Sequence, residues 1–273
     1  MMQTSGLDFV APLFVPANRP ERFKKAAASG ADAVILDLED AVAPEAKQEA
    51  RRSVHLGLGL SEHPVLVRIN GMGSAWHGDD VALVSSLPVD GIILPKAEIG
   101  RSLLRLAADL RRRLPIIALI ETARGLRDAF EIAAFPGIAR LAFGSIDFCA
   151  EMGCSHTREA LLSARSSLVF ASRLAGKLPP LDGVTTSVDD PNLAREDARY
   201  ARDLGFGGKL AIHPRQIGPI YAGFRPDEGE VAWAHRVLRA GEGAVAVDGA
   251  MVDAPVRTRA HSIIARAQAA LPR

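Results

Sequence analysis

Eight short apolar runs recur along the chain, and a stretch typical of a helix follows each one. The apolar runs occupy residues 9–16, 33–38, 64–69, 90–95, 115–120, 139–144, 180–185 and 207–212. Strands that alternate with helices of about 10–15 residues indicate βαβ units and a parallel sheet. Helices are therefore expected at residues 20–29, 44–56, 78–86, 99–113, 123–134, 157–175, 191–203 and 214–222. This alternation predicts an α/β fold, a (β/α)8 TIM barrel over residues 1–222.

A doubly wound open sheet is the alternative fold for such an alternation. That fold normally has a glycine-rich phosphate-binding turn after its first strand, whereas the first run here leads into PANRP. The chain has 273 residues, close to the roughly 250 residues typical of a barrel. The barrel is therefore the favoured interpretation.

The pattern changes after residue 222. Residues 223–273 are expected to form a helix, a turn between two short extended pieces, and a last helix from Arg257. We expect this segment to be an appendage to a complete barrel that packs on a neighbouring subunit of a homo-oligomer.

Composition excludes several classes of protein. The 33 Lys and Arg residues are balanced by 32 Asp and Glu, a formal net charge of +1, so no basic stripe for nucleic acid is expected. No run approaches the ~18 uninterrupted apolar residues of a membrane helix, and the N-terminus has no targeting signal. Cys149 and Cys154, with His156 nearby, lack the fourth ligand and spacing of a zinc site. We expect a cytoplasmic protein with two reduced thiols and no membrane partner.

Two apolar runs end in a single carboxylate followed by a loop. These are PIIALIET, which contains Glu121, and LAFGSIDF, which contains Asp147. Because chemistry collects at the carboxyl ends of barrel strands, the two acids are expected to face each other across the barrel mouth. Such oxygen ligands suit Mg²⁺, which takes one or two protein carboxylates and leaves its other positions to water and substrate. The alternative is that each acid caps its strand or pairs with Arg124 or Arg127.

More charged residues end the neighbouring runs. The second run ends in DLED, where Asp37 and Glu39 alternate to one face. Arg68 ends the third run and suits bidentate binding of a substrate carboxylate, while Lys96 follows the fourth. The alternative for Asp37, Glu39 and Arg68 is a buried ion-pair network that ties the strand ends together. Lys96 lies among acids that raise its pKa, so we expect a positioning lysine and not a Schiff base.

The chain resembles the citrate lyase β-subunit-like family, which includes malyl-CoA and citramalyl-CoA lyases and is related to metal-dependent barrel aldolases. The resemblance covers nearly the whole chain and rests on these strings: LFVPANRPERFKKAAASGADAVILDLEDAVAP, VRIN, GIILPKAE, ALIETARG, FGSIDF, GFGGKLAIHPRQI and GAMVDAP. One segment departs, because MGCSHTRE stands where the citrate lyase β-subunit has a TRGDG-like loop. This departure disfavours citryl-carrier-protein chemistry, so a CoA thioester is expected at least as much as a carrier-protein thioester.

The resemblance implies a barrel that assembles as a trimer or hexamer. It implies that Glu121 and Asp147 hold Mg²⁺, that Arg68 binds substrate, and that the DLED acids support the site. It further implies that Asp253 acts as acid or base in the active site of an adjacent subunit.

The expected activity is Mg²⁺-dependent cleavage of a carbon–carbon bond in a 3-hydroxyacyl thioester, of the citryl-, malyl- or citramalyl-CoA type. Backbone N–H groups around Gly144 and Ser145 are expected to hold substrate charge. A thioesterase or a condensing synthase could use the same groups. A non-catalytic subunit that binds an acyl carrier is the alternative from a different class.

Overall fold

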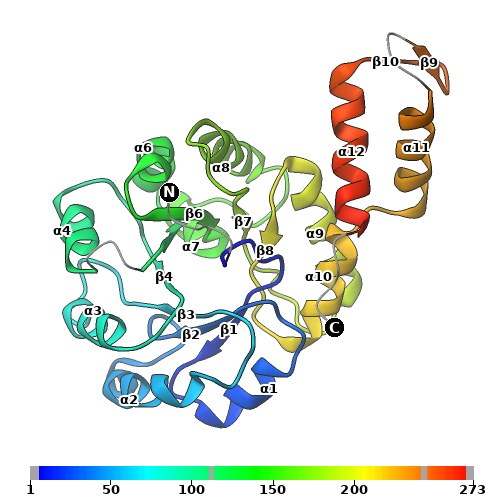
Figure 1. Cartoon of the computed structure of the whole chain (residues 1–273). Coiled ribbons are helices and arrows are strands. Elements are labelled where there is room, and N and C mark those ends of the chain that lie inside the picture. The colour runs from blue at the N-terminus through cyan, green and yellow to red at the C-terminus, as the bar shows by residue number, and fades with distance from the viewer. Residues whose placement is uncertain (1–5, 111–113, 241–244, 269–273) are drawn as a thin grey trace.

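Eight parallel strands form one sheet in sequence order (Figure 1). The structure is a computed structural model, which describes residues 6–110, 114–240 and 245–268. The sheet closes because Leu13 of the first strand pairs with Ala211, just after the last, through Phe14 N–H and the Ala211 carbonyl at 2.9 Å. The predicted (β/α)8 TIM barrel is confirmed. The strands are β1 Leu13–Pro16, β2 Val34–Asp37, β3 Val65–Arg68, β4 Gly91–Leu94, β5 Ile116–Ile120, β6 Ile138–Phe143, β7 Leu181–Asp182 and β8 Gly208–Lys209.

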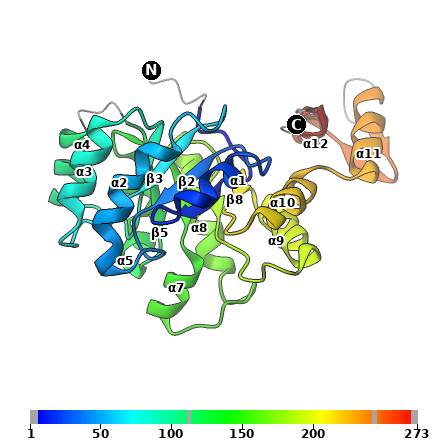
Figure 2. The same ribbon diagram turned by 90° about the horizontal axis from the view of Figure 1, so that it is seen from below.

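Helices lie between successive strands and cover the outside of the sheet (Figures 1 and 2). Two differences from the predicted pattern concern the site. The expected helix at 123–134 is divided at Asp128 into α5 and α6, and an unpredicted helix, α7, begins at Ser145 directly after β6. The helices are α1 Phe23–Ala27, α2 Lys47–Gly57, α3 His77–Ser86, α4 Arg101–Asp109, α5 Ala123–Arg127, α6 Ala129–Ala134, α7 Ser145–Met152, α8 Leu162–Leu174, α9 Pro191–Leu204 and α10 Ile217–Phe224.

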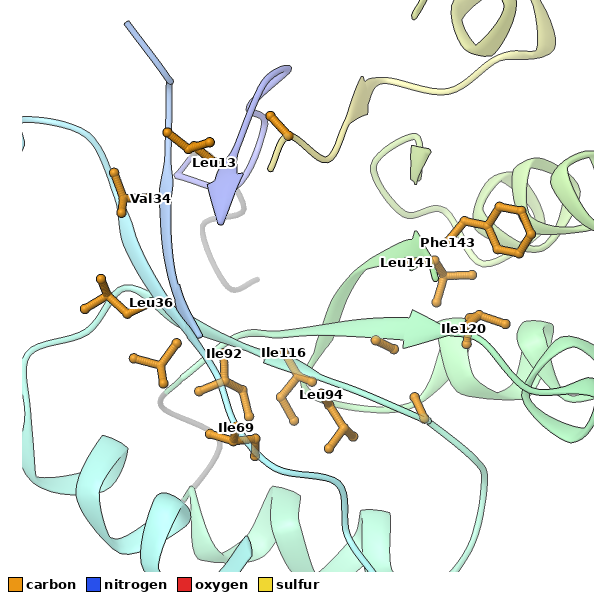
Figure 3. Close-up of a cluster of buried hydrophobic side chains, with 14 of the residues drawn as sticks. Leu13, Val34, Leu36, Ile69, Ile92, Leu94, Ile116, Ile120, Leu141 and Phe143 are labelled. Atoms are coloured by element: carbon orange, nitrogen blue, oxygen red, sulfur yellow. The ribbon is translucent and has the colours of Figure 1, made fainter. Parts of the chain in front are cut away.

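Alternation along each strand divides the buried side chains into two sets. Ile35, Leu66 and Ile117 belong to the smaller cluster, inside the barrel. The larger cluster fills the space between sheet and helices, and Figure 3 shows part of it, including Leu36, Ile92 and Ile120. Burial of each such side chain stabilises the fold by ~1.5–3 kcal/mol. The strands are thereby fixed in register, and the residues that follow them are held at one rim.

The chain continues from the barrel into an arm with its own small core. The arm consists of α11 Glu228–Arg239, a hairpin of β9 Val245–Val247 and β10 Ala250–Val252, and α12 Ala254–Gln268. Its core residues are Ala234, Val237, Val252, Ala260 and Ile263. The last helix begins three residues before the predicted Arg257, because the Asp253 carboxylate accepts the N–H of Val256 at 3.1 Å and so caps the first turn.

The arm projects away from the barrel in both views, with the hairpin at its far end (Figures 1 and 2). At its base, Arg202 of α9 pairs with Glu230 of α11 at 3.0 Å. The packing of this arm on a neighbouring subunit stays a prediction. In the described part of the chain, no helix is long and apolar enough to cross a membrane.

Candidate active site at the carboxyl ends of the strands

Asp37 and Arg68 are the last residues of β2 and β3, and the parallel register places them opposite each other. The Arg68 guanidinium binds both Asp37 oxygens, through Nε at 2.7 Å and Nη2 at 2.6 Å. Burial lowers the pKa of Arg68, but the charge of Asp37 more than offsets this and the pKa is raised. The ion-pair alternative therefore describes Asp37. The Arg68 guanidinium, which the sequence predicted to bind a substrate carboxylate, is bound to Asp37 through Nε and Nη2. Its remaining nitrogen, Nη1, faces Glu39.

Glu39 lies two residues beyond β2 and is 6% exposed. Its Oε1 accepts the Lys96 ammonium at 2.9 Å, and its Oε2 lies 3.2 Å from Arg68 Nη1 without forming a hydrogen bond in the described residues. Burial raises the pKa of this carboxyl, against the lowering effect of Arg68 and Lys96. Glu39 is thus an acid that holds protons more tightly than an exposed glutamate.

Lys96 contacts both Glu39 and Glu121. Its backbone has φ 47°, a left-handed conformation that is unusual for a residue with a side chain. In this conformation its N–H donates to Glu121 Oε1 at 2.8 Å while its ammonium binds Glu39. Burial lowers the pKa of Lys96, but the hydrogen bond and charge of Glu39 outweigh it, so the pKa is raised, as the sequence predicted. A raised pKa leaves little of the neutral amine that imine formation needs, which favours a positioning role.

Glu121 follows β5 and is 1% exposed. Burial, and then the charges of Glu39 and Asp147, raise its pKa to about 8. Its second oxygen, Oε2, is buried and has no hydrogen-bond partner among the described residues. A carboxylate in this position is stabilised by a cation, because neighbouring protein charges are mainly negative.

Asp147 does not end a strand, as the sequence suggested, but lies in the first turn of α7. The prediction was wrong because β6 stops at Phe143 and α7 begins at Ser145, with Gly144 as its N-cap. Gly144 packs so closely on Glu121 that a Cβ at this position would overlap Oε2. The helix therefore brings half-buried Asp147 near Glu121 by a different route, and its charge acts on the Glu121 pKa.

This acid cluster fits Mg²⁺. Glu121 Oε2 is a buried hard donor without a partner among the described residues, and Glu39 Oε2 makes no hydrogen bond there although Arg68 Nη1 lies 3.2 Å away. In residues 6–110, 114–240 and 245–268, no group of three or more His, Cys, Asp or Glu is arranged to hold a metal. Coordination by two protein carboxylates, completed by water and substrate oxygens, is the arrangement that Mg²⁺ favours.

A second charged cluster lies at the ends of β7 and β8. Asp182 accepts Arg165 at 2.8 Å and Lys209 at 3.1 Å. Burial raises the pKa of Asp182, but Lys209 and Arg165 reverse that effect and the pKa is lowered. Beside this cluster, His156 Nε2 lies 2.9 Å from Ser145 Oγ. Burial, with Arg165 and Lys209, lowers the pKa of His156 and keeps it neutral near pH 7.

The sequence analysis missed three polar residues behind the rim, Lys47, Asn70 and Asp80, all of which are buried. One signal was available for Lys47. It lies on the same face of α2 as Ala50 and Val54, so the helical period places a lysine on an apolar face.

A cavity of about 790 Å³ opens beside Glu39 and Lys96, and Lys47, Asn70 and Trp76 also line it. The structure brings Asp37, Glu39, Arg68, Lys96, Glu121, Gly144, Ser145 and Asp147 to one end of the barrel. It does not bring Asp253, which joins β10 to α12 in the arm; Figure 1 shows that these two elements lie away from the barrel mouth.

A (β/α)8 barrel with buried acids at the carboxyl ends of its strands belongs to the class of barrel enzymes that act at this end. The model of the HpcH/HpaI aldolase/citrate lyase family matches residues 11–214, and the chain belongs to this family. Lyases predominate in the family, although some of its members are thioesterases.

Similar proteins agree with this assignment. The citrate lyase subunit beta-like protein of Mycobacterium tuberculosis is 40% identical over 265 residues, 93% of this chain and 94% of the relative. A (3S)-malyl-CoA thioesterase of Cereibacter sphaeroides is 33% identical, over 96% and 95% of the two chains. The structure of CitE from M. tuberculosis with magnesium, acetoacetate and coenzyme A has a TM-score of 0.85 and 38% identity, over 95% and 98% of the chains.

Proposed function

We propose that this protein is a Mg²⁺-dependent carbon–carbon lyase that cleaves a 3-hydroxyacyl-CoA, of the citryl-, malyl- or citramalyl-CoA type, into an acetyl thioester and a 2-oxo acid. The observation that carries the proposal is the buried oxygen Glu121 Oε2, which has no partner among the described residues, together with Glu39 Oε2, which faces Arg68 Nη1 at 3.2 Å without a hydrogen bond. A cation and an oxygen-rich substrate would satisfy both. The magnesium and coenzyme A bound to the M. tuberculosis relative support the same conclusion.

Glu121 and Asp147 would hold the metal, since Glu121 Oε2 has no donor in the part of the chain that the structure describes and Asp147 lies close enough to affect the pKa of Glu121. When bound, Mg²⁺ supplies a Lewis acid for a hydroxyl or carbonyl oxygen. The first N–H groups of α7, from Ser145, are free of intrahelical partners and suit a substrate carboxylate.

The cleavage moves one proton from the substrate hydroxyl to the methylene carbon that becomes the acetyl methyl group. We assign Glu39 Oε2 to take the hydroxyl proton, because it makes no hydrogen bond within the described residues and burial raises the pKa of this carboxyl. Arg68 Nη1 and the Lys96 ammonium would stabilise negative charge beside it. Arg68 would then act on substrate through Nη1 alone, since Asp37 occupies its fork.

The proton for the carbon would come from Asp253 of an adjacent copy. Within one chain, Asp253 lies between β10 and α12 of the arm, and the arm projects away from the barrel (Figures 1 and 2). A trimer or hexamer in which each arm reaches a neighbouring barrel would complete the site. This assembly is what the family resemblance implies.

A panel of citryl-, malyl- and citramalyl-CoA with Mg²⁺ tests the proposal. We expect equal amounts of acetyl-CoA and one 2-oxo acid from at least one of them, and no product after treatment with EDTA. Free CoA together with a hydroxy acid would identify a thioesterase instead. That second candidate is favoured by the 33% identity to a malyl-CoA thioesterase. A chain that turns over none of the three and binds no Mg²⁺ would contradict the proposal.

A further inference from the structure

Lys47, the first residue of α2, has its side chain buried behind the rim, with 5% of the residue exposed. Its ammonium donates to the Leu38 carbonyl at 2.7 Å, the Glu39 carbonyl at 2.7 Å and Asn70 Oδ1 at 2.8 Å. These three bonds use all the donors that a lysine ammonium has. The ammonium is thus fully satisfied, which a buried charge requires.

The acceptors of Lys47 are carbonyl groups at the base of the Glu39 side chain. They belong to the residue before Glu39 and to Glu39 itself, so the ammonium fixes the backbone from which the carboxylate extends. Asn70 reinforces this, because its amide nitrogen donates to the same Leu38 carbonyl at 2.9 Å and to Asp80 at 2.6 Å. A lysine retained only to balance acids would bind their carboxylates directly.

We propose that Lys47 is a positioning residue that orients the Glu39 carboxylate between Lys96 and Arg68. The effect on turnover rests on the proposed function, in which Glu39 holds the hydroxyl proton. The effect on Mg²⁺ affinity does not rest on the proposed function. Glu39 adds negative charge at Glu121 and so contributes to a metal site there, whatever reaction follows. Lys47 itself is too enclosed by its three acceptors to reach a substrate proton.

The cavity of about 790 Å³ makes the proposal testable by chemical rescue. Lys47, Asn70 and Trp76 all line this cavity, so truncation of Lys47 to alanine opens a space that is continuous with it. Ethylammonium has a similar head group and can enter such a space. Restoration of function by ethylammonium separates a positioned ammonium from a mere loss of packing.

Lys177 provides a matched control. Its ammonium donates to the Ile138 carbonyl at 2.7 Å, and burial lowers the pKa of Lys177 as it does that of Lys47. Ile138 begins β6, so this lysine lies at the opposite end of the barrel. Lys177→Ala removes a half-buried ammonium that also binds a backbone carbonyl, without touching Glu39.

For Lys47→Ala we expect kcat to fall about 10- to 100-fold with less than threefold change in KM, and Mg²⁺ affinity to fall about threefold to tenfold. Ethylammonium at tens of millimolar should recover at least a tenth of the lost kcat. It should leave Lys177→Ala and the wild type unchanged. If Lys47→Ala does not fold, Lys47→Gln keeps one or two of the hydrogen bonds and should show a smaller loss of the same kind.

Coupling to Glu39 supplies a test that does not depend on turnover. Mg²⁺ affinities of Lys47→Gln, Glu39→Gln and the double variant, measured by calorimetry, should be non-additive, because the first change acts through the second residue. Additive losses, together with no ethylammonium rescue, would overturn the proposal. If the wild type binds Mg²⁺ but cleaves no thioester, the proposed function fails while the coupling still decides the role of Lys47.

Discussion

The two charged clusters at the barrel mouth are both buried, but they differ in how completely their charges are satisfied. On the β7–β8 side, both oxygens of Asp182 are paired, one with Arg165 and the other with Lys209, although Arg165 Nη1 has no hydrogen-bond partner in the described residues. On the β2–β5 side, Glu39 Oε2 faces Arg68 Nη1 at 3.2 Å without a hydrogen bond, and Glu121 Oε2 has no partner among the described residues. We call the first cluster closed because its carboxylate is fully paired, and the second open because the Glu121 carboxylate is not. The comparison supports the proposal that a metal binds beside Glu121, between β2 and α7, and that the β7–β8 cluster is structural.

The largest expected effect is on the closed cluster. Asp182→Ala leaves the Arg165 and Lys209 cations buried without their carboxylate, which should lower the free energy of unfolding by ~3–5 kcal/mol. Chemical denaturation measures this loss. Glu121→Gln in the open cluster, compared without metal, should not destabilise the protein. Equal destabilisation by the two variants would remove the distinction between the clusters.

The pH dependence of stability follows from Glu121. Its pKa is about 8 in the folded protein and 4.5 in an ordinary glutamate. Between these values the folded state binds more protons than the unfolded state, so stability without metal should fall as pH rises from about 5 to 8. The slope is at most ~1.4 kcal/mol per pH unit. In Glu121→Gln this slope should disappear, and excess Mg²⁺ should reduce it in the wild type. An unchanged slope in the variant would assign it to another group.

Arg68→Lys should have an effect of intermediate size. Lysine keeps the charge but cannot bind both Asp37 oxygens and face Glu39 at once. We expect kcat/KM to fall about 10- to 100-fold, equivalent to ~1.5–3 kcal/mol of charge-assisted hydrogen bonding. Arg158→Lys, which alters an ion pair with Asp197 of α9, is the control. Wild-type kinetics in Arg68→Lys would show that the guanidinium geometry does not matter.

The smallest expected effect is at His156. His156→Ala removes its hydrogen bond with Ser145 and should lower the free energy of unfolding by ~1 kcal/mol. His156→Gln can keep that bond and should recover about half of the loss, as thermal melting would measure. A loss above ~3 kcal/mol for His156→Ala would place the residue in the closed network with Asp182.

Much of the fold could be predicted because buried parallel strands have a strong apolar signal. The positions of the charged residues at the strand ends could be predicted from the same alternation, as for Asp37 and Arg68, which end β2 and β3. Asp147 did not, since the change from strand to helix at Gly144 depends on the close contact with Glu121. That contact joins residues 23 positions apart and leaves no local pattern.

Side-chain contacts between different strands and helices could not be predicted from the sequence either. Arg68 binds Asp37 because the strand register places the two residues opposite each other. From the sequence alone, binding of a substrate carboxylate and a buried ion pair were both possible roles for Arg68. Lys47 was missed because a lysine near the start of a helix is ordinarily exposed. Its burial depends on carbonyls of another element and on Asn70, 23 residues away.

Calorimetric titration of the metal-free protein with Mg²⁺ tests the central claim most directly. One Mg²⁺ per chain should bind to the wild type, and Glu121→Gln and Asp147→Asn should each weaken binding at least tenfold. Near pH 7 binding should also release protons, because a metal favours the ionised form of Glu121, and the apparent enthalpy should then depend on the buffer. Unchanged affinity in both variants would contradict the assignment of the open cluster as the metal site.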